Sequence, residues 1–194
     1  MNNPSAKQIR IWVEKISESD KEAFNSLFRS LYPQLLKYAL RFIRSKVVAS
    51  DITQDAFVTL WDKRDELDGQ RSVKAYLYRI VRNSSLNYIR DHSSETIGLD
   101  DVEESRIEVA EEEQPEETDE LINLLKEWIK ELPDRRREAF VLSRFEGLDH
   151  EEIADVMDIS SNTVNNHIVA ALDYLKDCSI EYQKEMNNKR QGYD

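Results

Sequence analysis

A run of short polar side chains late in the sequence has the chemistry to read the edges of base pairs in duplex DNA. The run consists of Ser161, Asn162, Thr163, Asn165, Asn166 and His167. An asparagine amide can form two hydrogen bonds with adenine, and a serine hydroxyl can bond several base edges. We therefore treat this run as a candidate DNA-reading surface.

The elements that would position this run are two short amphipathic helices. Asp149 stands three residues before Glu152, which is the spacing of a capping box and predicts the start of the first helix. Ser160 can cap a second helix, along which apolar residues recur at steps of three and four: Val164, Ile168, Ala171, Leu172 and Leu175. Two such helices joined by a short turn are typical of a helix-turn-helix, whose second helix lies in the major groove. Similar helix pairs also occur in domains that never touch DNA, and the polar outer face is what favours DNA reading here.

A second run, in the first half of the chain, interleaves cations with aromatic rings. It follows a polar loop, residues 65–72, on a predicted helix whose inner side carries Val73, Tyr76, Leu77, Ile80, Val81 and Ser84. The outer side is predicted to carry Arg71, Lys74, Tyr78 and Arg82, flanked by Arg79, Asn83 and Arg90. Cations can follow the phosphates of single-stranded nucleic acid while rings stack on its exposed bases. The alternative is an ordinary solvated helix face along which the arginine stems lie.

Three further helices are expected in the first half. The first is short and carries Ile9, Trp12, Val13 and Ile16 on one face. Ser19 and Glu22 have capping-box spacing and predict the start of a second helix, which Pro33 is expected to bend or interrupt. A third is predicted to begin near Asp51, with Gln54 completing its capping box. The acidic side of that helix is either simply solvated or a docking face for a basic partner helix.

The composition indicates an all-α protein made of two small helical domains. The chain has 194 residues, a net charge of −12, and only four glycines and four prolines. Segment 96–120 holds 12 acidic residues, one basic residue and no aromatic ring. Because such a segment cannot bury enough apolar surface to offset the entropy of ordering, we expect a flexible acidic linker. The expected domains are residues 1–95 and 121–178, followed by a C-terminal tail, 179–194.

Neither an enzyme nor a membrane-spanning protein is indicated. The sequence has no glycine-rich phosphate loop, no metal-ligand cluster and no nucleophile paired with a base, so no cofactor and no metal are expected. The longest uninterrupted apolar run, residues 168–172, is far too short to cross a bilayer, and the N-terminus lacks a signal-peptide pattern. The single cysteine, Cys178, cannot form an internal disulfide, so a reducing, cytoplasmic location is expected.

Three segments resemble parts of the bacterial RNA polymerase sigma factors. Residues 51–64 (DITQDAFVTLWDKR) resemble the segment with which those factors grip the polymerase clamp. Residues 75–90 (AYLYRIVRNSSLNYIR) resemble the promoter-melting segment. Residues 132–172, which include the two helices described first, resemble the C-terminal helix-turn-helix domain.

The order, spacing and total length of these segments are similar to those of the extracytoplasmic-function group, which keeps only these two domains. The resemblance covers about residues 20–90 and 121–177, which is most of the chain. The wording of residues 160–172, SSNTVNNHIVAAL, resembles members from the Bacteroidetes.

The resemblance implies a promoter-recognition subunit and not a catalyst. Its partners would be core RNA polymerase, promoter DNA and an anti-sigma factor, often membrane-anchored, with no insertion of this chain into a membrane. Carried over by position, the polymerase-binding residues are Asp51, Gln54, Asp55, Phe57, Trp61 and Arg64. The residues for melting and reading the minus-ten element are Arg71, Lys74, Tyr76, Tyr78, Arg79, Arg82 and Asn83, and the loop 65–72 would capture a flipped base. The polar run at 161–167 would face the minus-thirty-five element as intact duplex.

One departure from the family pattern concerns the DNA-reading helix. The family usually carries several Arg or Lys after the Thr-Val pair, whereas this chain has Asn165, Asn166, His167, Val169 and Ala170 there. Phosphate contacts by cations supply much of ordinary DNA affinity.

The alternative function is a free-standing helix-turn-helix regulator that binds paired half-sites without polymerase. The basic aromatic helix and the acidic linker argue against this alternative.

Overall fold

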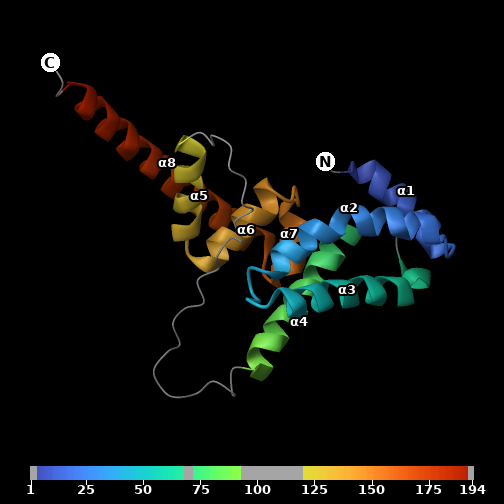
Figure 1. Ribbon diagram of the computed structural model, residues 1–194. Helices are drawn as coiled ribbons and strands as arrows, with labels where there is room; N and C mark the ends of the chain where they lie inside the picture. Colours follow the sequence, from blue (N-terminus) through green and yellow to red (C-terminus); the bar gives the residue numbers. More distant parts are fainter. Residues whose placement is uncertain (1–3, 68–71, 93–119, 192–194) are drawn as a thin grey trace. The chain divides into compact units, whose positions relative to one another are not determined.

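The computed structural model describes three stretches of the chain, residues 4–67, 72–92 and 120–191 (Figure 1). All regular elements in these stretches are helices, which confirms the all-α prediction. The chain divides into two units, residues 1–110 and 111–194, each with its own buried core. The predicted linker, 96–120, lies outside the described residues apart from Glu120, and its boundaries stay predictions.

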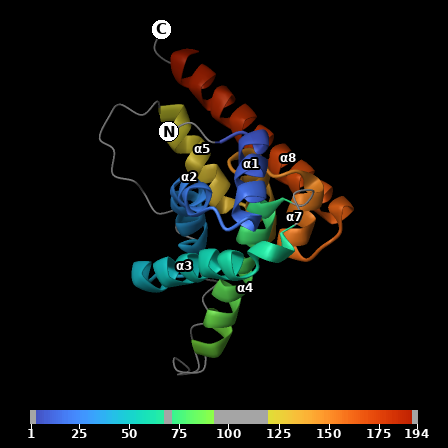
Figure 2. The ribbon, with the colours of Figure 1, turned by 90° about the vertical axis from the view of Figure 1, so that its right-hand side faces the viewer.

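The first unit is built around helix α2 (Lys21–Ala39). The other elements of this unit are α1 (Ala6–Ser17), α3 (Lys46–Asp62), the short 3-10 helix η1 (Arg64–Glu66) and α4 (Val73–His92). Helix α2 contacts α1, α3 and α4, and α3 also packs on α4 (Figures 1 and 2). The large side chains buried between these helices are Ile16, Leu27, Leu31, Leu35, Tyr38, Phe57, Leu60, Leu77 and Tyr78. This apolar core fixes which sides of α3 and α4 remain available to partners.

Two helix starts in this unit differ from the predicted ones. Asp20, and not Ser19, caps α2, because its carboxylate accepts hydrogen bonds from the backbone N–H groups of residues 22 and 23 at 2.8 and 3.1 Å. Ser19 has a φ of +65°, which is outside the extended conformation that a capping residue adopts. Helix α3 starts at Lys46 behind the cap Ser45, so Asp51 lies inside the helix.

Helix α2 runs unbroken through Pro33, which was expected to bend or interrupt it. A proline removes one backbone hydrogen bond from a helix and crowds the preceding turn. Pro33 is exposed, so water can reach the backbone on that side of the helix. The continuous core packing of Leu27, Leu31 and Leu35 on the opposite side keeps both halves of the helix together.

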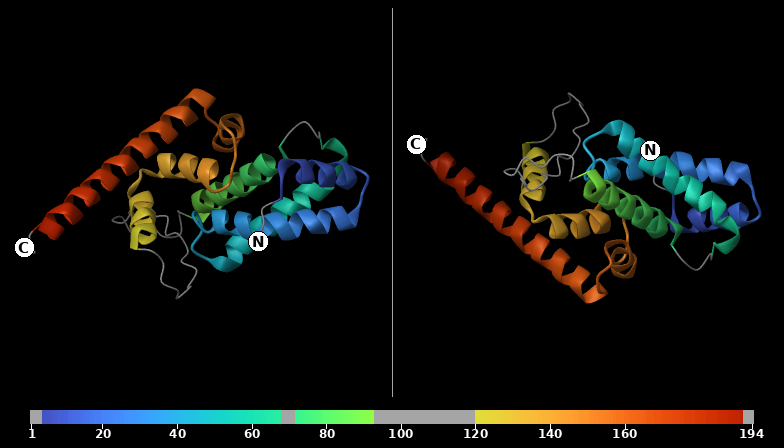
Figure 3. Two further views of the ribbon diagram at one scale, coloured as in Figure 1. Left: turned by 90° about the horizontal axis from the view of Figure 1, so that it is seen from above. Right: turned by 90° about the horizontal axis from the view of Figure 1, so that it is seen from below.

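The second unit packs three short helices against one long helix. The elements are α5 (Glu120–Glu131), α6 (Asp134–Arg144), α7 (His150–Met157) and α8 (Ser161–Gln191). Helix α8 contacts the other three, and Figure 3 shows its C-terminal part running on past α6 and α7. The core includes Ile129, Leu132, Phe140, Val141, Ala171 and Leu175. The segment predicted as a C-terminal tail was residues 179–194. Residues 179–191 of it continue α8.

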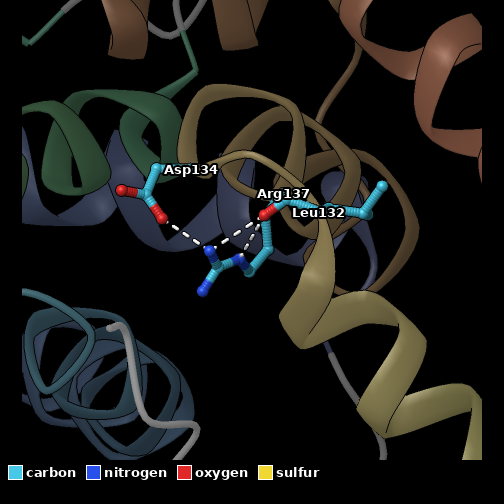
Figure 4. Close-up of polar contacts among 3 residues, drawn as sticks. All are labelled: Leu132, Asp134 and Arg137. Carbon is cyan, nitrogen blue, oxygen red and sulfur yellow. Dashed lines mark hydrogen bonds and ion pairs between the residues drawn. The ribbon is translucent and has the colours of Figure 1, made fainter. Parts of the chain in front are cut away.

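A buried arginine fixes the turn between α5 and α6 (Figure 4). Both Nε and Nη2 of Arg137 donate hydrogen bonds to the backbone carbonyl of Leu132, at 3.2 and 2.9 Å. Nη2 also pairs with Oδ1 of Asp134 at 2.5 Å. Arg137 is therefore part of the structure of this turn. Arg135, Arg136 and Arg144 are exposed.

A hydrogen bond made by the side chain of Tyr174 joins α8 to α5. The hydroxyl of Tyr174 donates a hydrogen bond to Oε2 of Glu131 at 2.5 Å. This bond to a carboxylate, together with a bond to Cys178 and partial desolvation, raises the pKa of Tyr174 well above its usual value. A raised pKa in the folded state means that the stabilisation is fully present below the unfolded pKa of about 10 and is lost as the pH rises beyond it.

We expect Tyr174→Phe to lower the free energy of unfolding of the second unit by about 1 kcal/mol at pH 7, because the bond is to a charged acceptor but is partly solvated. The difference between the variant and the unchanged chain should shrink above about pH 10. Denaturant unfolding followed at several pH values measures both quantities. Tyr182→Phe removes a hydroxyl from the same helix and serves as the control. Equal losses in both variants would contradict the assigned hydrogen bond.

Candidate nucleic-acid interface

The first helix of the predicted helix-turn-helix begins with a complete capping box. Oδ1 of Asp149 accepts hydrogen bonds from the N–H groups of Glu151 and Glu152 at 2.9 and 2.8 Å. The Glu152 carboxylate in turn accepts from the N–H of Asp149 at 2.8 Å. The predicted start of this helix is confirmed. Gly147, with a φ of +67°, makes the turn between α6 and this cap, a conformation that glycine adopts without strain.

The turn between α7 and α8 is short and has a hydrogen bond at each end. Asp158 has a φ of +55° and ends α7, with its N–H donating to the carbonyl of Ala154. Ser160 Oγ accepts from the N–H of Thr163 at 3.1 Å, as its predicted capping role requires. Ile153 and Met157 of α7 are buried, as are Val164 and Ile168 of α8, and the two helices contact each other. These contacts fix the angle at which α8 presents its outer side.

The polar run predicted to read DNA lies mostly on that outer side. Ser161, Asn162, Asn165 and Asn166 are exposed, whereas Thr163 and His167 are half-buried. The hydroxyl of Thr163 also shares a hydrogen bond of 2.8 Å with Ser160 Oγ, so it belongs to the cap. Val169, 47% exposed, continues the outer side by one turn. Leu172, one of the apolar residues that recur at helical spacing, is 40% exposed.

The outer stripe predicted on α4 is wrong in two of its positions. The side chain of Tyr78 is 0% exposed and that of Arg82 is 5% exposed. The Tyr78 ring lies 5.0 Å from the Tyr38 ring in the core, and Lys74, half-buried, places Nζ 5.9 Å from the Tyr78 centroid. The cause is that α4 packs on both α2 and α3, which widens its buried side beyond the residues that periodicity identifies. Arg71 lies outside the described residues.

The polar surface of α4 is instead a neighbouring strip at steps of three and four residues. We call it the α4 strip: Tyr76, Arg79, Asn83, Asn87 and Arg90. Tyr76 is half-buried and the others are exposed. Sequence reasoning missed Asn87, although its spacing from Asn83 is the same as that of Asn83 from Arg79. The strip keeps the combination of an aromatic ring, cations and amides that suits single-stranded nucleic acid.

The polar loop before α4 is only partly described. Residues 68–71, where a flipped base was predicted to bind, lie outside the described residues. Ser72 precedes α4 and caps it, with its Oγ accepting a hydrogen bond from the N–H of Ala75 at 3.2 Å. The base-capture role of the loop therefore stays a prediction.

The residues predicted to bind a partner on α3 separate into exposed and packed groups. Asp51, Gln54 and Asp55 are exposed. Phe57, in contrast, is 1% exposed, and its ring lies 4.8 Å from that of Phe28, so it supports the core and cannot touch a partner. The spacing of Phe57, four residues after Thr53 and three before Leu60, both of which are buried, could have shown this.

The last two predicted partner residues sit beside a groove. Arg64 belongs to η1 and not to α3, and its guanidinium lies 5.0 Å from the Trp61 ring centroid. Its Nε donates to Ser19 Oγ and its Nη1 to the Trp61 carbonyl, both at 2.9 Å. Trp61 is half-buried and lines a groove of about 330 Å³, together with Lys21, Phe24, Asn25 and Val58.

Within residues 4–67, 72–92 and 120–191, no group of His, Cys, Asp and Glu side chains is arranged to hold a metal ion. No helix in that part of the chain is both long and apolar enough to cross a membrane.

Comparison with known proteins decides the family. The family model for Sigma-70 region 2 matches residues 27–95, and that for Sigma-70 region 4 matches residues 122–175. The RNA polymerase sigma-H factor of Pseudomonas aeruginosa is 30% identical over 168 residues, which are 82% of this chain and 87% of that protein. The ECF RNA polymerase sigma-E factor of Escherichia coli K12 is 30% identical over 174 residues, 84% of this chain and 89% of that protein. This chain belongs to the extracytoplasmic-function (ECF) RNA polymerase sigma factors.

Two solved structures share the fold of this sigma factor. That of CnrH in complex with the cytosolic domain of CnrY has a TM-score of 0.57 and 25% identity, covering 88% of this chain and 96% of that one. That of the sigma factor RpoE in complex with the anti-sigma factor NepR from Bartonella quintana has a TM-score of 0.59 and 21% identity, covering 80% and 95%. The predicted family is confirmed, and the resemblance to Bacteroidetes members stays a prediction.

The region 2 match contains the whole α4 strip and the exposed acidic residues of α3. The region 4 match contains α7 and the first half of α8, and it stops at Leu175, where the long C-terminal part of α8 begins. As an ECF sigma factor, the protein directs promoter-specific transcription by RNA polymerase.

Proposed function

We propose that three exposed surfaces of this sigma factor divide the work of initiation. The outer side of α8 reads the minus-thirty-five element as duplex, and the α4 strip reads and helps to melt the minus-ten element. The exposed acidic side of α3 docks on core RNA polymerase. The observation that carries this proposal is that amide and cationic side chains, which have the chemistry to contact bases, are exposed on one helix of each family match: α4 in region 2 and α8 in region 4.

The base-reading surfaces call for different forms of DNA. Amides on a helix that follows a helix-turn-helix turn suit the major groove of a duplex. Rings and guanidinium groups suit unpaired bases, which can stack on them once the strands separate. The domain division that accompanies this proposal is residues 1–95 for polymerase binding and for reading and melting the minus-ten element, 96–120 as linker, and 121–178 for reading the minus-thirty-five element.

The same proposal makes the chain an initiation factor and not an enzyme, acting in the cytoplasm where RNA polymerase works. We also propose an anti-sigma protein, membrane-anchored or free, as its inhibitor. The support is that the similar structures of CnrH and of RpoE from Bartonella quintana were each solved in complex with another protein, the cytosolic domain of CnrY and the anti-sigma factor NepR.

In vitro transcription tests the proposal directly. The purified chain is mixed with core RNA polymerase and a library of genomic promoter fragments, and RNA 5′ ends are mapped. Discrete starts that require the chain would support the proposal and give both promoter elements. If the chain neither binds core polymerase nor yields starts, and instead binds duplex DNA alone as a dimer, the free-standing regulator would be the better function.

Replacing two exposed side chains of the α4 strip tests the melting role. We expect Arg79→Ala with Asn83→Ala to lower transcription from a fully paired promoter about tenfold or more, because contacts to unpaired bases offset the cost of unstacking them. A promoter with mismatched strands across the minus-ten region needs little melting, so its loss should be much smaller. Run-off transcription from the two templates measures this difference.

The matched control for this prediction is Arg29→Ala, which removes an exposed arginine from α2, away from the strip. It should leave both templates unaffected. Equal losses on paired and mismatched templates would show that the strip does not contribute to melting.

A further inference from the structure

We infer that α8 reads an upstream element rich in A·T pairs, with its asparagines selecting adenine, and that it does not select guanine. This inference rests on the proposed function of α8 and specifies the bases that the helix reads. It concerns the α8 strip, which we define as Asn162, Asn165, Asn166 and Val169.

The α8 strip is an exposed surface without formal charge. Asn165 and Asn166 are adjacent, and each lies three or four residues from Asn162 and from Val169; all four are exposed, while Val164 and Ile168 on the opposite side are buried. Residues 160–172 contain no Lys, Arg, Asp or Glu. In the part of the chain that the structure describes, the three strip amides make no hydrogen bonds, so their donors and acceptors remain available.

The chemistry of this strip favours adenine over guanine. Adenine presents an N6 donor beside an N7 acceptor in the major groove, and an asparagine amide supplies the complementary acceptor and donor. Guanine presents two acceptors, O6 and N7, which arginine or lysine matches with two donors, and the strip has neither. The methyl groups of Val169 can pack against the C5-methyl of thymine, the partner of adenine.

Two neighbouring residues of the predicted reading set are poorly placed to change this preference. The Thr163 hydroxyl is bonded to Ser160 in the helix cap. His167 is half-buried at the flank of the strip. Ser161 is exposed, but its hydroxyl can bond several base edges and does not select among them, so the asparagines are the groups of α8 that discriminate between bases.

The strip also sets the length of the element. From Asn162 to Val169 the helix rises about 10 Å, which corresponds to about three stacked base pairs. One turn further along the same side, the exposed carboxylate of Asp173 would approach the phosphate backbone and be repelled by it. We therefore expect a core of about three A·T pairs, without a required guanine.

Selection from a random promoter library tests the inference. The full chain and core RNA polymerase transcribe a pool of duplexes with a randomised upstream region, and the templates that yield RNA are sequenced. The expected result is adenine enrichment at adjacent upstream positions on one strand.

Variants assign the preference to individual side chains. Asn165→Ala and Asn166→Ala should each reduce the adenine preference at one position about tenfold, and Asn166→Arg should replace it by a preference for guanine. Asn187→Ala changes an exposed asparagine at the far end of the same helix and should leave the enriched sequence unchanged.

The outcomes separate the inference from the function on which it rests. An enriched upstream element containing a required guanine would overturn the inference while supporting the proposed function, as would adenines indifferent to both alanine variants. Chain-dependent transcripts without any enriched upstream element would overturn the assignment of α8 as the minus-thirty-five reader, and the inference with it.

Discussion

Reversing the charge of the exposed acidic side of α3, through Asp51→Lys with Asp55→Lys, is expected to weaken binding to core RNA polymerase about 100-fold. The two carboxylates lie one helical turn apart and both are exposed, so their replacement disturbs no core packing. If a basic helix of the polymerase docks here, two lysines place like charges against it, and such juxtaposition costs several kcal/mol. Surface plasmon resonance or competition for core polymerase against an unmodified sigma factor measures the change.

The chain offers a matched control on α1. Glu14→Lys with Glu18→Lys makes the same change of charge at the same spacing, again on exposed residues, but outside the region 2 match. Its effect on binding should be several-fold at most. If both pairs weaken binding equally, the loss reflects the total charge of the chain and not a docking surface on α3. The same conclusion would follow if both variants bind polymerase more weakly than the unchanged chain at low salt but all three bind equally well at high salt.

Arg137→Ala is expected to lower the free energy of unfolding of the second unit by about 3 kcal/mol. The substitution leaves the carbonyl of Leu132 without its two donors and removes the partner of Asp134, in a turn where the arginine is buried. Loss of one buried partner costs the desolvation of the group left behind, typically about 1–3 kcal/mol and more where charge is involved. Hydrogen exchange of the amides in α5 and α6 measures the loss in this unit alone.

Two further variants separate shape from charge at this turn. Arg136→Ala removes the adjacent, exposed arginine and should change stability by about 0.5 kcal/mol or less. Arg137→Lys keeps the positive charge but cannot donate two bonds from a planar fork, so its loss of stability should lie between those of Arg136→Ala and Arg137→Ala. A lysine variant as stable as the unchanged chain would show that charge alone holds the turn.

Local signals in the sequence were sufficient where a single motif determines the structure. The capping box at Asp149 and the serine cap of α8 depend on residues three apart, and both are present as predicted. These two caps gave the starts of both helices, and the starts in turn allowed the exposed position of the asparagines on α8 to be predicted. The start of α2 was misplaced by one residue because Ser19 and Asp20 are both suitable capping residues, and only the backbone conformation distinguishes them.

The misplaced site residues have a different cause, which lies in tertiary packing. Periodicity gives the direction of a buried face but not its width, which depends on how many neighbours cover the helix. Because α4 is covered by both α2 and α3, Tyr78 and Arg82 are buried and the polar strip shifts to Arg79 and Asn83. Phe57 is buried for the same reason, in the aromatic contacts between α2 and α3.

Because α8 is one unbroken helix, a movement of its C-terminal end would be transmitted along the helix to its DNA-reading end. Its 31 residues span about 45 Å, and no hinge separates the strip at Asn165 from the end near Gln191. A tilt of about 10° imposed at the far end, pivoting near Leu175, would move Asn165 by about 3 Å, close to the rise of one base pair. Force applied more than 20 residues away, outside the region 4 match, would therefore be transmitted to the DNA-reading end as a change of register.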